Sequence, residues 1–159
     1  MGKTRVLRGE LQEFQYGGAV NVIQNDQRFN HGFIIKDFRI SSNDPGDSNA
    51  SSRDCFGVLA THADAFEAQT SSTRIGFNWA DRRQVAWTST NHIGDSVVDW
   101  TDALIDPTHV VVRDLYVAVT ALTATSSRIW CYYIELEEVA LTDNQSVLAI
   151  IQEESQDVN

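Results

Sequence analysis

The sequence has few prolines and cysteines, and it is poor in basic residues. Its 159 residues include two Pro, two Cys and one Met, and 12 Lys and Arg stand against 22 Asp and Glu, which gives a net charge of −10. Binding to the phosphates of nucleic acids needs clustered Lys and Arg, so this deficit argues against a nucleic-acid-binding protein. The negative charge instead favours a soluble, self-repelling surface.

The two cysteines, Cys55 and Cys131, are far apart and belong to no CxxC motif or Cys/His cluster. Such clusters supply the ligands of structural zinc, so we expect no zinc site. Unpaired cysteine is commonly buried, and two free, buried thiols are therefore the expected state. One long-range disulfide is the alternative.

Long hydrophobic runs are also missing. No stretch approaches the roughly 20 apolar residues of a membrane helix. The basic residues at the start of the sequence are not followed by the apolar segment of a signal peptide. We therefore expect no membrane contact and synthesis in a cytoplasm.

No sequence motif of a known catalytic site is present. A GxSxG nucleophile elbow, an HExxH motif and a P-loop are all missing. The many carboxylates would allow a glycosidase-like pair, but every acidic β-protein has many. The metal site of a cupin-type barrel needs a His-x-His pair and a Glu, whereas the histidines here are isolated: His31, His62, His92 and His109. We expect neither enzyme activity nor a cofactor.

Strand-like segments recur along the chain. They are rich in Val, Ile, Thr and Ser, which suits β-structure. Residues 90–101 are mostly loop, with a short strand at 96–100 as an alternative. In the third segment, Ile34, Phe38 and Ile40 are expected on one face. We expect strands over residues 4–16, 19–26, 32–41, 55–61, 73–79, 82–89, 109–122 and 128–140.

Turn residues separate these strands. Gly17-Gly18 supplies the positive φ of a two-residue turn and predicts a hairpin between the first two strands. Residues 41–54, rich in Ser, Asn, Asp and Gly, predict a long exposed loop. Residues 62–72 fit either a helical turn or a loop, and Asp106-Pro107 predicts a turn. Eight or nine strands with crossing loops predict an all-β fold, an antiparallel β-sandwich of the jelly-roll type, over residues 1–141.

The last part of the chain has the clearest pattern. Trp130, Tyr132, Ile134 and Leu136 fall on one face of the final strand, which we expect at an inner edge of the sandwich with these residues in the core. The sequence from Thr142 to Gln145 is a capping box and predicts a short helix within residues 142–159. The apolar stripe of this helix is expected to pack on the sandwich or on a neighbouring subunit: Val147, Leu148 and Ile151.

The charges at the end of this helix are unfavourable. Glu153 and Glu154 oppose the helix dipole, so this end either frays or meets a basic partner. At the opposite terminus, Lys3, Arg5 and Arg8 form a basic arm that is either solvated or paired with the acidic tail.

Aromatic and paired basic residues complete the candidate interface. Trp87 and Trp130 have apolar neighbours and are expected in the core, whereas Trp79 and Trp100 are near strand ends and are candidates for a surface or subunit contact. The pair Arg82-Arg83 is either solvated or bound to acidic residues of a neighbour. The full candidate interface is Arg5, Arg8, Trp79, Arg82, Arg83, Trp100, Val147, Leu148 and Ile151.

Three segments, FNHGFIIKDFRIS, IDPTHVVVRDLYV and YYIELEEVALTDNQSVLAIIQEESQDV, resemble small structural proteins of marine bacterial viruses, of the capsid or head-decoration kind. The resemblance implies a virion protein, made in the host cytoplasm, that forms homo-oligomers and contacts other virion proteins. The basic arm is shorter than genome-binding arms, which argues against a genome-lining role. The alternative is a carbohydrate- or receptor-binding sandwich of a spike or fibre, with Trp79, Trp100 and loop 41–54 at its ligand.

Overall fold

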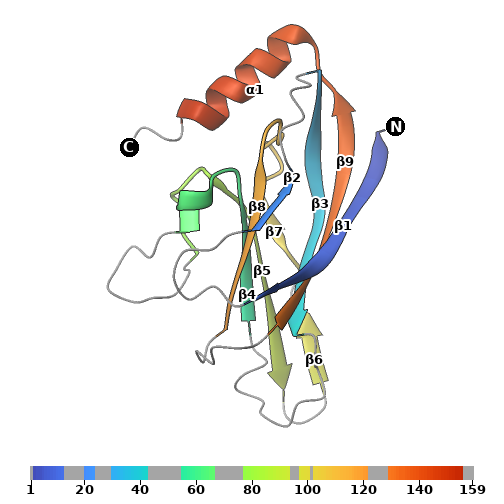
Figure 1. Cartoon of the computed structure of the whole chain (residues 1–159), viewed down its shortest axis with the longest axis vertical. Coiled ribbons are helices and arrows are strands. Elements are labelled where there is room, and N and C mark those ends of the chain that lie inside the picture. The colour runs from blue at the N-terminus through green and yellow to red at the C-terminus, as the bar shows by residue number, and fades with distance from the viewer. Residues whose placement is uncertain are drawn as a thin grey trace.

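Two antiparallel β-sheets face each other, and a C-terminal helix stands above one end of them, in the computed structural model of the chain (Figure 1). The structure describes residues 2–12, 20–23, 30–42, 55–66, 77–93, 97–100, 102–121 and 129–155. The expected all-β fold with a short C-terminal helix is therefore confirmed. The predicted Gly17-Gly18 turn and most of loop 41–54 lie outside the described residues.

The first sheet has three strands in the order β1 (Lys3–Gln12), β9 (Ile129–Ala140) and β3 (His31–Ser42). The prediction that the final strand is an edge was wrong, because β9 pairs with β1 on one side and with β3 on the other. Its expected alternation is confirmed: Trp130, Ile134 and Leu136 are completely buried and Tyr132 packs against the same core.

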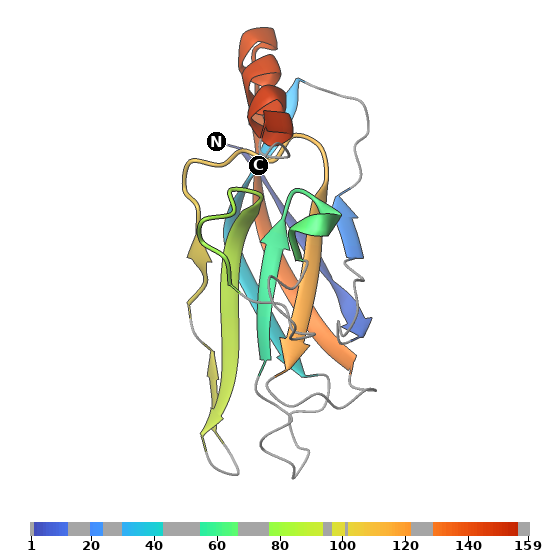
Figure 2. The same cartoon turned by 90° about the vertical axis from the view of Figure 1, so that its left-hand side faces the viewer.

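The second sheet lies in front of the first when the molecule is turned (Figure 2). A two-residue strand, β7 (Leu104–Ile105), pairs with β5 (Gln84–Ile93) beside the main path. The main path runs in the order β2 (Val20–Ile23), β8 (Leu115–Ala121), β4 (Cys55–Ala60), β5 (Gln84–Ile93) and β6 (Val97–Trp100). Residues from both sheets form one hydrophobic core, including Phe38, Ile40, Leu59, Val85, Leu115 and Ile134.

A β-bulge at Lys36 changes which residues of β3 face the core. Ile35 is opposite Leu136 and Asp37 is opposite Glu135, so Lys36 has no partner on β9. Because side chains alternate along a strand, the extra residue shifts the inward set by one position. Phe33 and Ile35 are buried before the bulge, and Phe38 and Ile40 after it. The placement of Ile34 on the core face was therefore wrong.

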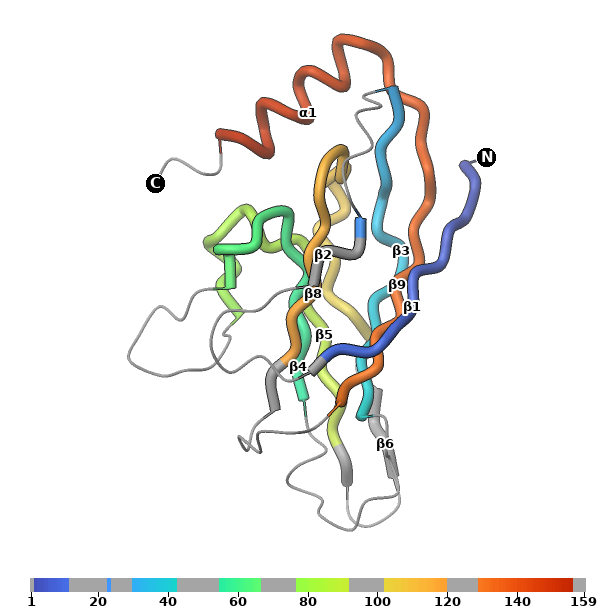
Figure 3. The backbone as a smooth tube through the Cα atoms, viewed as in Figure 1, coloured from blue at the N-terminus to red at the C-terminus, as the bar shows by residue number. Residues whose placement is uncertain are grey.

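The first two strands do not form the predicted hairpin. β1 pairs along its whole length with β9, whereas β2 pairs with β8 in the other sheet. The ten aligned residue pairs between β1 and β9 involve a strand at the far end of the sequence, which a local turn pattern does not indicate. The backbone trace shows the result: the N-terminus and the start of the helix lie at the same end of the molecule (Figure 3).

Several predicted boundaries also shift. Residues 77–83 form turns, not the end of the predicted strand 73–79, and β5 starts at Gln84 and continues to Ile93. Within the predicted strand 109–122, β8 begins only at Leu115. Val111 instead forms a β-bridge to Phe33 of the first sheet. The short strand at 96–100 is present as β6, and a single 3-10 turn, η2 (Ala63–Phe66), occupies part of the ambiguous segment 62–72.

On the outer side of the second sheet, η2 covers a smaller core. Phe66 and Ala65 pack there with Val58 and Trp87. The Trp87 indole donates a hydrogen bond to Gln84 Oε1 at 2.8 Å, and Gln84 Nε2 donates to the Ala65 carbonyl at 3.0 Å. The expected burial of Trp87 and Trp130 is confirmed. No helix in the described ranges is long and apolar enough to span a membrane.

Candidate functional site

The C-terminal helix α1 (Asp143–Ser155) begins with the predicted capping box. Thr142 Oγ1 accepts a hydrogen bond from the Gln145 backbone N–H at 3.4 Å, and Gln145 Oε1 accepts one from the Thr142 N–H at 3.0 Å. Two N–H groups that lack partners within the helix are satisfied in this way. The direction of α1 is therefore fixed where it leaves β9.

The two buried residues of α1 are polar, whereas three of its large apolar residues are exposed. Ser146 and Glu153 are 3% and 2% exposed, whereas Val147, Leu148 and Ile151 are 55%, 61% and 54% exposed. The last three residues form what we call the apolar stripe. A helix that packs only on its own domain normally buries such a stripe. Here each of the three side chains is more than half exposed.

Two glutamates hold the far end of α1 to the segment that precedes β8. Glu153 Oε1 accepts a hydrogen bond from the buried Val112 N–H at 3.0 Å and lies 3.8 Å from His109 Nε2. Glu154 Oε1 forms an ion pair with Arg113 Nη1 at 2.6 Å. Of the two alternatives for this end, the structure shows the basic partner, and it belongs to the same chain. We call these contacts the glutamate latch.

The turn beside the latch is also held by a carboxylate. Asp106 accepts hydrogen bonds from the backbone N–H of Thr108 at 2.9 Å and from its hydroxyl at 2.7 Å. Burial alone would raise the pKa of Asp106, but these bonds and the nearby His109 ring lower it below its ordinary value. The expected turn at Asp106-Pro107 is present and well supported.

The two glutamates of the latch are expected to differ in their contribution to the free energy of unfolding. Glu153→Ala leaves the buried Val112 N–H without its acceptor, so we expect the free energy of unfolding to fall by about 1–3 kcal/mol. Glu154→Ala removes a pair in which the glutamate side chain is 62% exposed, and such surface pairs are worth about 0–1 kcal/mol. Urea denaturation of both variants measures the difference. Equal losses would contradict a dominant role for Glu153.

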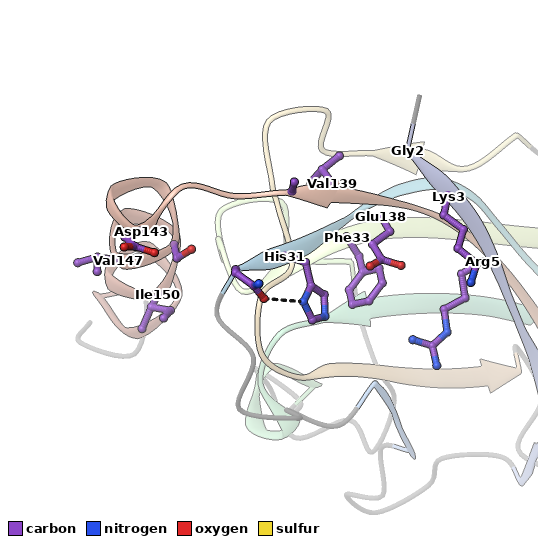
Figure 4. A pocket seen from close by; sticks show the side chains of 13 residues that line it. Gly2, Lys3, Arg5, His31, Phe33, Glu138, Val139, Asp143, Val147 and Ile150 are labelled. Atoms are coloured by element: carbon purple, nitrogen blue, oxygen red, sulfur yellow. Dashed lines mark hydrogen bonds between the residues drawn. The ribbon is translucent and has the colours of Figure 1, made fainter.

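An open groove of about 1470 Å³ lies between α1 and the end of the first sheet that is closest to this helix. It is lined by Asp143, Val147 and Ile150 of the helix and by Lys3 and Arg5 of β1, which lies on the opposite side (Figure 4). Lys3 pairs with Glu138 on β9, and Glu138 pairs with Phe33 on β3. These three residues are therefore on the face of the first sheet that also carries the core residues. The Arg5 guanidinium lies 5.8 Å from the centre of the Phe33 ring.

The remaining basic candidates lie elsewhere. Arg8 is exposed on β1 and alternates with Arg5, so it belongs to the outer face of the sheet. Arg82 is exposed on a turn, whereas Arg83 forms ion pairs within its own chain with Asp81 at 2.8 Å and Asp64 at 3.1 Å. Burial alone would raise the pKa of Asp81, but hydrogen bonds from Arg83 lower it below its ordinary value.

Trp79 is 70% exposed, as expected for a surface or contact residue. Its turn is well ordered by hydrogen bonds: the Asp81 N–H donates to the Asn78 carbonyl at 3.1 Å, and the Ala80 N–H donates to the Asn78 side chain at 3.2 Å. The side chain of Trp100 lies outside the described residues. The placement of Trp100 in the candidate interface therefore stays a prediction.

Neither cysteine forms a disulfide bond: Cys55 is buried and Cys131 is partly buried. Burial, together with the nearby charge of Glu10, raises the pKa of the Cys131 thiol. A thiol with a raised pKa is less often the reactive thiolate. In the ranges that the structure describes, no three His, Cys, Asp or Glu residues gather closely enough to hold a metal ion.

The site thus has two adjacent parts, the apolar stripe and the groove. The sequence identified the stripe by its helical spacing, and it included Arg5, but it missed Lys3 as a groove residue and Glu153 as a buried hydrogen-bond acceptor. The pairing of β1 with β9 creates the groove, and sequence spacing carries no signal for such a pairing. No protein-family model matches the chain, and neither a curated protein nor a solved structure matches it.

Proposed function

We propose that this protein is a structural subunit of a bacteriophage virion, a jelly-roll β-sandwich that oligomerises to build, cement or decorate the shell. One observation carries the proposal: α1 is capped at one end and latched at the other, yet it presents Val147, Leu148 and Ile151 to solvent. A helix held in place with its apolar side outward is suited to contact a neighbouring subunit.

The strand pairings support the jelly roll. In that fold, eight strands are wound so that the first pairs with the last, the second with the seventh, the third with the sixth and the fourth with the fifth. Here β1 pairs with β9, β2 with β8 and β4 with β5. The segment around Val111 takes the sixth place, since Val111 and Phe33 of β3 exchange backbone hydrogen bonds at 2.9 and 2.8 Å.

The assembly role is tested by making the apolar stripe polar. In Leu148→Gln plus Ile151→Gln, the helix is kept and two exposed apolar side chains are lost, so we expect the oligomer to dissociate to monomers with at least about a hundredfold weaker association, given roughly 1.5–3 kcal/mol for each buried side chain. Native mass measurement over a concentration series gives the association constant. Gln152→Ala, on an exposed polar position of the same helix, is the matched control.

A trimer or pentamer of the unmodified protein, lost in the double variant and kept in the control, supports the proposal. An oligomer that survives the double variant shows that α1 is not the assembly element. A protein that is monomeric at every concentration favours the second candidate, a carbohydrate- or receptor-binding sandwich, for which the exposed Trp79 is the supporting observation.

A further inference from the structure

Helix α1 is held to the sandwich mainly by polar contacts. Its two buried residues are Ser146 and Glu153, and no apolar side chain of the helix is fully buried. Burial of apolar side chains is the main source of stabilisation between packed elements. Detaching α1 therefore exposes little apolar surface, and the free energy needed to detach it lies mostly in the glutamate latch.

The segment that receives α1 recognises it through specific contacts. The buried Val112 N–H donates to Glu153, and Arg113 pairs with Glu154. Both contacts are made by side chains near the far end of the helix, and both would form equally well with α1 of another copy. The structure thus identifies α1 as the occupant of this segment, whichever copy supplies the helix.

The link between β9 and α1 is short. It consists of Leu141 and Thr142, and the Leu141 N–H donates one hydrogen bond to the Asn30 carbonyl at 2.9 Å. The capping bonds between Thr142 and Gln145 belong to the helix itself. A rotation of the backbone at the link would therefore carry α1 as a unit. Short hinge segments favour the exchange of the element that follows them between copies.

We infer that α1 is exchanged between copies: each helix leaves its own sandwich at the link and docks on residues 109–113 of a neighbour; this inference rests on the proposed assembly function. The latch contacts are the same in a closed monomer and in an exchanged oligomer, so they contribute little to the association constant. The apolar stripe decides the balance, because only the oligomer buries it. The latch then selects the partner, and the stripe supplies the affinity.

Cross-linking between labelled and unlabelled copies tests the exchange. In Arg113→Lys the positive charge beside Glu154 is kept, and a carbodiimide can join the new amine to the carboxylate as an amide, taking up the water that is lost. Protein labelled with a heavy nitrogen isotope is mixed with an equal amount of unlabelled protein where both are monomeric, and the mixture is concentrated until native mass measurement shows the oligomer. Mass spectrometry then identifies the cross-linked peptides, and circular dichroism checks that the variant folds.

The chain offers a matched control for this experiment. Lys36 and Glu137 form an ion pair at 3.1 Å between β3 and β9 of the first sheet, and the same reagent can join them. This pair stays within one chain when only α1 is exchanged, so its cross-links should not combine labelled with unlabelled peptides. Random exchange of α1 instead predicts that about half of the cross-links between positions 113 and 154 combine one peptide of each kind.

The two proposals can fail separately. Mixed cross-links at 113–154 with unmixed ones at 36–137 support the exchange. Unmixed cross-links at both places in a protein shown to be an oligomer overturn it, and the assembly function stands if Leu148→Gln plus Ile151→Gln still dissociates that oligomer. Mixed cross-links at both places, or none at 113–154, also overturn it, because they show contact beyond α1 or an unformed latch. A protein that is monomeric at every concentration removes both proposals.

Discussion

Trp130→Ala is expected to lower the free energy of unfolding by about 3–5 kcal/mol, the range for removing a large aromatic side chain from a core. Trp130 is completely buried, and it lies opposite Leu11 on β1 and Ser42 on β3, so its loss leaves a cavity in the core at one end of the first sheet. A protein of this size is stable by about 5–15 kcal/mol. Urea denaturation followed by circular dichroism measures the loss.

Trp79→Ala is the control for the chemistry of the change, because the same side chain is removed from a 70% exposed site. Its effect should stay within about 0.5 kcal/mol. Trp130→Phe refines the result, since the buried Trp130 Nε1 has no hydrogen-bond partner among the described residues. Removing that N–H offsets part of the cavity, so this variant should lose clearly less than the alanine variant. Equal losses at positions 79 and 130 would show that the core is placed wrongly.

The second large effect comes from shortening β3 by one residue at either of two positions. Deleting Lys36 removes the bulge and leaves Ile35 and Phe38 inward, with the loss of an exposed ion pair between Lys36 and Glu137. Deleting Ile34 aligns Lys36 with Leu136 and turns Ile35 outward, which buries a charge and exposes an apolar side chain. We expect the first variant to fold and the second to be unfolded, as measured by thermal denaturation.

The two deletions control each other, because each removes one residue from the same strand. If both variants fold with similar melting temperatures, the first sheet adjusts its register freely and the bulge does not determine which residues face the core. If both unfold, the strand tolerates no change of length, and the bulge has a role beyond register.

Features that depend on residues close in sequence were predictable. The alternation of β9 and the Thr142–Gln145 capping box each involve neighbours within one strand or one helical turn, and the structure confirms both. The stripe of Val147, Leu148 and Ile151 was also visible as a spacing. Whether it packs on its own sandwich was not, because that depends on which residues of the helix meet the rest of the chain.

Features that depend on distant partners were not predictable. Strand pairing is decided by packing between segments far apart in sequence, so the hairpin suggested by Gly17-Gly18 gave way to β1 with β9 and β2 with β8. The bulge at Lys36 is set by its alignment with β9. Glu153 opposes the dipole of its own helix, and the N–H group that donates to it belongs to Val112, 41 residues away.

The pairing of β1 with β9 also sets the order in which the molecule can be completed during synthesis. Lys3 is aligned with Glu138 and Gln12 with Ile129, so the first strand to be made must wait for nearly the whole chain before its partner exists. Contacts this distant in sequence form slowly, and an unpaired strand with exposed Leu7 and Leu11 is prone to aggregate in the meantime. The charges of Lys3, Arg5 and Arg8 on that strand counter this tendency during the wait.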